Sequence, residues 1–144
     1  MKKMNVAIIG DKFMGKAHSN AWKQAAYFFD IPIQPVLKVA CGRNAEQLKS
    51  FAQRWGWEEV ETDWRKIVGR KDIDIIDVST PTWLHHDIVI EAAKAGKHIY
   101  CEKPMALSYL EAKQMYQAAQ AAKGKHYINF NYRRCPAIML AKQL

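Results

Sequence analysis

The chain has 144 residues, of which 49% are hydrophobic and 25% are charged. This composition is typical of a globular domain with a sizeable core, and it excludes collagen, coiled-coil and linker proteins. The net charge of +8 suggests an anionic partner without deciding among nucleic acid, a membrane surface and a phosphorylated ligand, and an ordinary solvated basic surface is the alternative. The three cysteines lack the spacing of a disulfide framework or a zinc knuckle.

Targeting and membrane-spanning signals are not evident in the sequence. The first ten residues contain too short an apolar run for a secretory signal, and no stretch approaches the ~20 apolar residues of a transmembrane helix. The basic residues do not accompany a helix–turn–helix, zinc-finger or RNP pattern. We expect a cytoplasmic protein with neither a nucleic-acid nor a membrane partner. We also expect no metal site, because His85, His86 and Asp87 point in different directions around a helix.

Apolar runs alternate with segments of helical period along the chain. Strands are predicted over residues 6–10, 36–41, 73–79, 98–101 and 126–131. Helices are predicted over 14–28, from an N-cap at Asn44 to Gly56, over 84–95, from an N-cap at Ser108 to Gly124, and from Pro136 onward. The alternation predicts an α/β domain with a doubly wound parallel sheet, a Rossmann-like dinucleotide-binding domain over residues 1–144.

Helical periodicity also predicts which helix faces are buried. The predicted stripes are Met14, Ala17, Ala21, Ala25 and Phe28 in the first helix, Leu48, Phe51, Ala52 and Trp55 in the second, Leu84, Ile88, Ala92 and Ala95 in the third, and Leu110, Met115, Ala118 and Ala122 in the fourth. The helix that begins at Pro136 has barely two turns and no C-cap, so we expect the chain to end inside an element.

The first strand leads into residues 10–15 (GDKFMG) and then into a helix. The dinucleotide-binding fingerprint has three glycines here, for a tight turn, for close approach to pyrophosphate and for helix–strand packing. This sequence has the outer two, and Lys12 stands at the middle position. Lys12 adds a positive charge, whereas its Cβ restricts close approach and Asp11 adds a repelling carboxylate. An ordinary strand–helix turn is the alternative to a cofactor loop made by Gly10, Lys12, Phe13, Met14 and Gly15.

The second strand ends in residues 40–44 (ACGRN). A domain that binds NAD usually has an acidic residue here, which holds the ribose 2′-hydroxyl. This chain instead has Gly42 and Arg43, and a guanidinium can pair with a 2′-phosphate. These two residues therefore favour NADP(H) over NAD(H). The alternative is that Arg43 is simply an exposed arginine in a loop.

Three further segments stand out, at residues 79–85 (STPTWLH), 96–104 (GKHIYCEKP) and 129–137 (NFNYRRCPA). Together they resemble the Gfo/Idh/MocA oxidoreductases over essentially the whole chain. The resemblance implies NAD(P)-dependent hydride transfer to or from a sugar, polyol or inositol-like hydroxyl. It also implies a second α/β domain beyond residue 144, which binds substrate, completes the active site and forms much of a homo-oligomer interface.

The resemblance assigns roles to particular residues. It implies that Lys103 is the catalytic lysine, which hydrogen-bonds the reacting hydroxyl and helps to move its proton. Glu102 is expected near the nicotinamide, where it orients Lys103, and Pro104 is expected to fix the turn. Further residues are implied to contact the cofactor, namely Ser79, Thr80, Pro81 and His85. For His85 the alternative is a residue at the start of a helix that is hydrogen-bonded to the loop. A last group is implied to line the cleft between the domains, namely Asn131, Tyr132 and Arg133, and a role of Arg133 in the domain interface is the alternative.

Several residues have ordinary structural interpretations. We expect His18 to be a packing histidine rather than a base, and Cys41 and Cys101 to be small buried hydrophobes. Apolar surface is expected near Phe130 and Tyr132, and also near Ile138, where the second domain is missing. A dinucleotide-sensing Rossmann module without catalysis remains the alternative function for such a chain.

Overall fold

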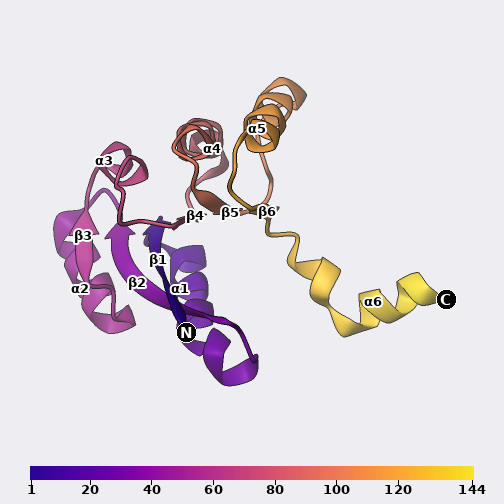
Figure 1. Ribbon diagram of the computed structural model, residues 1–144, viewed down its shortest axis with the longest axis horizontal. Coiled ribbons are helices and arrows are strands. Elements are labelled where there is room, and N and C mark those ends of the chain that lie inside the picture. The colour runs from indigo at the N-terminus through magenta and orange to yellow at the C-terminus, as the bar shows by residue number, and fades with distance from the viewer.

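Six parallel strands form a single sheet in the order β3-β2-β1-β4-β5-β6 (Figure 1). The computed structural model describes all residues 1–144. The strands are β1 (Lys2–Ile9), β2 (Ile33–Cys41), β3 (Glu59–Glu61), β4 (Ile75–Val78), β5 (His98–Cys101) and β6 (His126–Ile128). Every pairing between neighbouring strands is parallel, so the predicted doubly wound, Rossmann-like sheet is confirmed.

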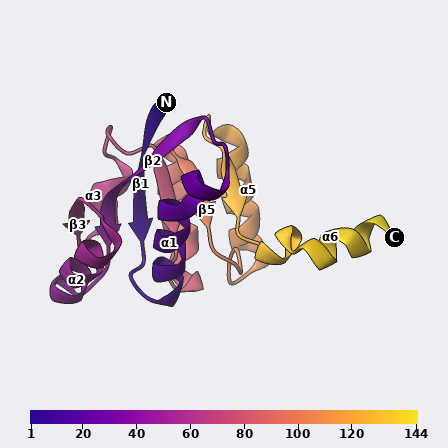
Figure 2. The same cartoon turned by 90° about the horizontal axis from the view of Figure 1, so that it is seen from below.

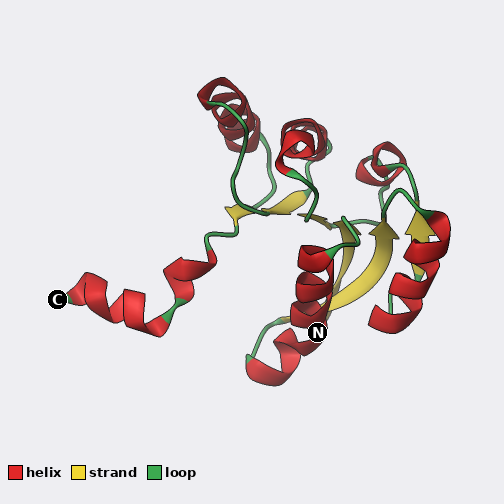
Figure 3. Cartoon of the chain, turned by 180° about the vertical axis from the view of Figure 1, so that it is seen from behind, coloured by secondary structure: helices red, strands yellow, loops and turns green.

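Helices cover both faces of the sheet, as Figure 3 shows from behind. The helices of the chain are α1 (Phe13–Phe28), α2 (Ala45–Trp55), α3 (Trp64–Val68), α4 (His85–Lys94), α5 (Tyr109–Ala121) and α6 (Pro136–Gln143), and all but α6 pack on the sheet. Helices α3, α4 and α5 lie on one face and α1 and α2 on the other (Figure 1). None of the helices is long and apolar enough to cross a membrane.

Alternate side chains of β1 enter two separate cores. Ala7 and Ile9 belong to the larger core under α3, α4 and α5, whereas Val6 and Ile8 belong to the smaller core against α2. This follows from the two-residue period of a strand that is covered on both faces. The central strand β1 therefore packs against a core on each face of the sheet, and this packing fixes the position at which the following loop begins.

The short elements β3 and α3 were not predicted from the sequence. β3 has only three residues, and it lies at the edge of the sheet with the exposed Val60 between two glutamates. α3 has five residues, of which Ile67 and Val68 are buried. Elements of this length present too few apolar residues for periodicity to identify them.

The predicted buried face of α1 is wrong. Its buried residues are Gly15, His18 and Ser19, whereas Phe28 is 73% exposed and Ala17 and Ala21 are exposed as well. The polar side chains of this face have partners inside the protein, since Ser19 Oγ donates to the carbonyl of Gly15 at 2.7 Å. A search for apolar stripes cannot find a face that is packed through hydrogen bonds.

Other helix predictions are confirmed in part. Asn44 caps α2 by accepting from the backbone N–H of Gln47, and Ser108 caps α5 by accepting from that of Glu111. In α2, Leu48, Phe51 and Ala52 are buried as expected. In contrast, two residues of the predicted stripes lie at the surface, namely Leu110, which is 63% exposed, and Ala95.

The last segment projects away from the sheet (Figure 2). It consists of a 3₁₀ turn over Asn131–Arg134 followed by α6, and neither element has a buried residue. The apolar surface expected there is present, since Phe130 is 47%, Tyr132 73% and Ile138 47% exposed.

Candidate functional site

The loop between β1 and α1 is shaped by two glycines. Gly10 has a φ of +124°, and a Cβ at this position would lie 2.4 Å from the carbonyl oxygen of Ser79. A Cβ on Gly15 would lie 2.0 Å from the carbonyl oxygen of Gly10. Both contacts exclude any side chain. They match the tight turn and the close helix–strand packing that a dinucleotide-binding loop requires.

The N-terminus of α1 opens directly from this loop. Lys12 occupies the N-cap position with extended backbone, and neither a side-chain cap nor an acidic residue satisfies the first turn. The first backbone N–H groups of the helix are therefore available to an anion. The Nζ of Lys12 donates to Oε1 of Gln47 on α2 at 2.8 Å, so this exposed side chain is tied to the neighbouring helix.

A cavity of about 640 Å³ lies at the carboxyl ends of β1, β2 and β4. The chain runs from β1 outward to β2 on one side of the sheet and later to β4 on the other, and such a switch point is where open α/β sheets bind ligands. The cavity brings together most of the residues predicted to bind cofactor, namely Gly10, Lys12, Phe13, Met14, Gly42, Arg43, Ser79, Thr80 and Pro81.

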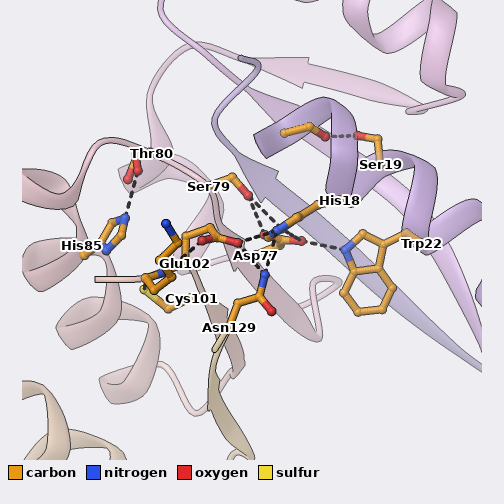
Figure 4. A network of polar contacts seen from close by, with 12 residues as sticks. His18, Ser19, Trp22, Asp77, Ser79, Thr80, His85, Cys101, Glu102 and Asn129 are labelled. Carbon is orange, nitrogen blue, oxygen red and sulfur yellow. Dashed lines mark hydrogen bonds and ion pairs between the residues drawn. The ribbon is translucent and has the colours of Figure 1, made fainter. Parts of the chain in front are cut away.

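A buried polar network lies beside this cavity and joins α1 to three strand ends (Figure 4). Its centre is His18, whose Nδ1 is 2.8 Å from Oδ1 of Asp77 and whose Nε2 is 2.9 Å from Oε1 of Glu102. Trp22 donates from Nε1 to Oδ2 of Asp77 at 2.7 Å, and Asn129 donates to Oε1 of Glu102. His18 is buried, as expected of a packing histidine, and it is in addition the centre of a hydrogen-bond network.

The charge state of His18 follows from its neighbours. Burial opposes the charged ring, but hydrogen bonds and charges from Asp77 and Glu102 outweigh it and raise the pKa of His18. The ring centroids of Tyr100 and His18 are 5.2 Å apart. Burial, together with the same two carboxylates, raises the pKa of the Tyr100 hydroxyl. Only the imidazolium form donates to both carboxylates at once.

Glu102 joins the network to the backbone of the following residue, Lys103. Its Oε2 accepts the backbone N–H of Lys103 at 3.0 Å, while the carboxylate itself is buried. Lys103 is exposed and lines a second cavity, of about 560 Å³, together with Phe130, Asn131, Tyr132, Arg133 and Ile138. The fold therefore brings Lys103 to the three consecutive residues expected to line a substrate cleft, although Lys103 lies in an earlier loop of the chain.

His85 lies beneath the cavities rather than in them. It is fully buried, and its ring nitrogens lie 2.9 Å from the carbonyl of Thr80 and 3.0 Å from that of Pro104. It therefore ties the loop after β4, through the contact with Thr80 that Figure 4 shows, to the loop after β5. Glu102 and Gly15 are likewise buried supports, so these predicted cofactor residues position the site from behind.

Three residues of the network, Asp77, Trp22 and Asn129, were not predicted from the sequence. One signal was available, because Asp77 is a carboxylate within the otherwise apolar residues 75–78 of a buried parallel strand. A buried carboxylate needs donors, and His18 and Trp22 are four residues apart on one helix face. Cys41 and Cys101 are buried, as expected. Burial is the main cause that raises the pKa of Cys101 to about 12.

Comparison with known proteins places the chain in a family. A family model described as an oxidoreductase family with an NAD-binding Rossmann fold matches residues 4–130. Levoglucosan dehydrogenase from Pseudarthrobacter phenanthrenivorans is 46% identical over 144 residues, which are 99% of this chain and 37% of that protein. D-apiose dehydrogenase from Paraburkholderia graminis is 29% identical over 138 residues, which are 96% of this chain and 35% of that protein.

A solved structure gives the same result. Levoglucosan dehydrogenase in complex with NADH superimposes with a TM-score of 0.95 and 46% identity, covering 99% of this chain and 38% of that one. The chain therefore spans little more than a third of the length of these relatives. It belongs to the Gfo/Idh/MocA oxidoreductase family, and the part of the family that it contains is the NAD-binding Rossmann domain.

Proposed function

We propose that the chain is the cofactor-binding domain of an NAD(P)-dependent oxidoreductase that moves a hydride to or from a sugar, polyol or inositol-like hydroxyl. The observation that carries this proposal is the position of Lys103. It follows β5, whose neighbour β4 ends at the dinucleotide-type cavity, and it lines the second cavity beside Asn131 and Arg133. The names of the relatives, a levoglucosan and a D-apiose dehydrogenase, support a carbohydrate-like substrate.

Each part of the site has a role in this proposal. The loop at Gly10 and the N-terminus of α1 bind the pyrophosphate, and residues 79–81 contact the ribose and nicotinamide. The bound nicotinamide supplies the hydride chemistry. Lys103 hydrogen-bonds the substrate oxygen through its ammonium group, stabilises negative charge there and exchanges the hydroxyl proton. Glu102 and His85 hold the two loops that carry these groups.

The proposed cofactor is a nicotinamide dinucleotide, and two residues of the cavity make opposite predictions about its ribose. Arg43 favours the 2′-phosphate of NADP(H), because it is exposed and has no ion pair within the chain. Asp11 favours a free 2′-hydroxyl. The NADH bound in the similar solved structure supports the second prediction.

The rest of the proposed active site, and a homo-oligomer interface, would belong to the substrate domain that the longer relatives have. A chimera therefore tests the reaction best. In it, residues 1–144 replace the matching segment of levoglucosan dehydrogenase, and turnover is measured with NADH or NAD⁺ and carbohydrate substrates.

In the chimera, Lys103→Met should lower kcat by roughly 10²–10⁴-fold, because no other ammonium replaces that of Lys103 at the substrate oxygen. Cofactor affinity, measured by fluorescence titration, should change little. Lys113→Met, on the exposed side of α5, is the matched control and should retain full turnover. An unchanged kcat in Lys103→Met would contradict the catalytic role, and a chimera that binds cofactor but never turns over would favour the dinucleotide-sensing alternative.

A further inference from the structure

The carboxylate of Asp11 lies in an unusual position at the end of β2. Asp11 follows Gly10 in the loop after β1, and its side chain is only 10% exposed. A Cβ placed on Gly42 would lie 2.9 Å from Cγ of Asp11 and 3.0 Å from its Oδ1. The carboxylate therefore occupies the volume that a side chain at position 42 would fill. That position is where dinucleotide-binding domains usually have the acid that holds the ribose.

This carboxylate accepts no hydrogen bond from any donor of the chain. Its one ion pair is with Lys12, whose Nζ is 3.7 Å from Oδ2 and donates instead to Gln47. A carboxylate that is shielded from most solvent without a donor carries a free-energy cost, which a ligand hydroxyl would relieve. Asp11, Gly42 and Arg43 all line the cavity of about 640 Å³, so a ligand there can reach the carboxylate.

Other acidic groups surround the same strand end. Burial, followed by the negative charges of Glu61, Asp63 and Asp11, raises the pKa of the Cys41 thiol to about 12. The opposing cations that line the cavity, Lys12 and Arg43, are both exposed, and solvent and salt weaken their attraction for an anion. The charge at the end of β2 therefore disfavours a second phosphate on the ribose.

We propose that Asp11 accepts hydrogen bonds from the adenosine ribose hydroxyls and thereby selects NAD(H) over NADP(H). The carboxylate that other domains supply from the end of β2 comes here from the loop after β1, and Gly42 leaves the space for it. The proposal rests on the proposed function in one respect, because the cavity has to bind a dinucleotide. It reverses the preference that Gly42 and Arg43 predict by themselves.

The test is a titration of the 144-residue chain with NADH and, separately, with NADPH. Trp64 and Trp83 line the cavity, so quenching of tryptophan fluorescence reports binding. We expect NADH to bind at least about tenfold more tightly than NADPH, as a hydrogen bond to a charged group would allow. Circular dichroism of every variant confirms that it is folded.

Two variants address the carboxylate separately. Asp11→Asn keeps the shape but removes the charge, and it should bring the NADH and NADPH affinities to within about threefold of each other. Gly42→Ala keeps the charge but places a methyl group against Cγ of Asp11, so it should weaken NADH binding several-fold. Glu46→Gln, in the exposed first turn of α2, removes the same charge elsewhere and should leave the affinity ratio unchanged.

The outcomes separate this proposal from the proposed function. Preference for NADPH in the unmodified chain, or a ratio that Asp11→Asn does not change, would overturn the role of Asp11 while cofactor binding itself stands. If Arg43→Ala abolished such a preference, Arg43 would be the residue that reads the ribose. A folded chain that bound neither dinucleotide would overturn both proposals.

Discussion

His18 lies between two carboxylates that are within hydrogen-bond distance of its two ring nitrogens, and only the imidazolium form donates to both. Because the three groups are buried, each depends on the others to offset its loss of hydration. The arrangement fixes Glu102, and through the backbone N–H of Lys103 it fixes the start of the loop that carries the proposed catalytic ammonium. A single side chain on α1 thus determines geometry at the ends of β4 and β5.

The raised pKa of His18 predicts a pH-dependent stability. The folded state binds the ring proton more tightly than the unfolded chain, so this contribution is complete below the unfolded pKa of about 6.5 and is lost as pH rises through the folded-state pKa. His18→Gln should lower the free energy of unfolding by about 1–3 kcal/mol near pH 6. The deficit relative to the unmodified chain should shrink towards pH 9 in urea titrations.

His86→Gln is the control for this experiment. His86 lies at the surface between Asp87 and Gln114, so its replacement should change the free energy of unfolding by less than about 0.5 kcal/mol at any pH. Deficits for His18→Gln that stay constant between pH 6 and pH 9 would show that its ring does not titrate in this range.

Single residues were predictable from the sequence where a local motif carried them. The outer glycines and Lys103 belong to short segments whose spacing is informative, and the structure places them at cavities or in the loop beneath. Asp77 and Asn129 come from distant parts of the chain and share no motif with His18. Their association depends on the order of the strands, which residue spacing does not encode.

At the scale of elements, α1 is packed by close approach and hydrogen bonds more than by apolar side chains. Gly15 allows the first turn to contact the backbone of Gly10. Ser19 joins the same helix to the smaller core, because its hydroxyl accepts from Nε1 of Trp57 at 3.0 Å. The position of α1 therefore depends on small and polar residues at four-residue spacing.

Two glycine substitutions should have opposite effects on stability. Gly15→Ala would force its methyl group against the carbonyl of Gly10, which is backbone, so it should cost more than about 1 kcal/mol in the free energy of unfolding. Gly69→Ala at the end of α3 meets nothing within 4 Å at an ordinary φ of −83°. It should be neutral or stabilising by up to about 1 kcal/mol. Thermal and urea unfolding of both variants measure the difference, and equal effects would contradict the packing described for α1.

Element predictions succeeded where apolar period and capping agreed. In α2 the Asn44 cap, the end at Gly56 and the burial of Leu48, Phe51 and Ala52 were predicted, whereas Trp55 of the same stripe is only half-buried. The predicted buried stripe of α1 was wrong, because hydrogen bonds and not apolar area decide which face of this helix is buried. β3 and α3 were not predicted, because both segments are too short to show a pattern. Pairing with β2 stabilises β3, and packing against α4 stabilises α3.

At the scale of the whole molecule, α6 contributes no buried residue. Deleting residues 136–144 should therefore change the free energy of unfolding by less than about 0.5 kcal/mol. Ile128→Ala in β6 is the comparison, since Ile128 packs against the larger core and its loss should cost more than about 1 kcal/mol. Urea unfolding of both variants decides the matter, and a large loss on deletion would mean that α6 packs against the sheet in solution.

The glycine loop between β1 and α1 is continuous in sequence, yet its shape is completed from far away. Gly10 packs against the carbonyl of Ser79, and the backbone N–H of Asn5 in β1 reaches a carboxylate oxygen of Asp74, 69 residues later. All strand pairings are parallel, so each one requires the closure of a long stretch of chain. During synthesis on a ribosome, residues 10–15 would emerge long before β4 can pair with β1. An isolated peptide of this loop, or a nascent chain that ends before residue 79, would therefore lack the backbone of Ser79 against which Gly10 packs.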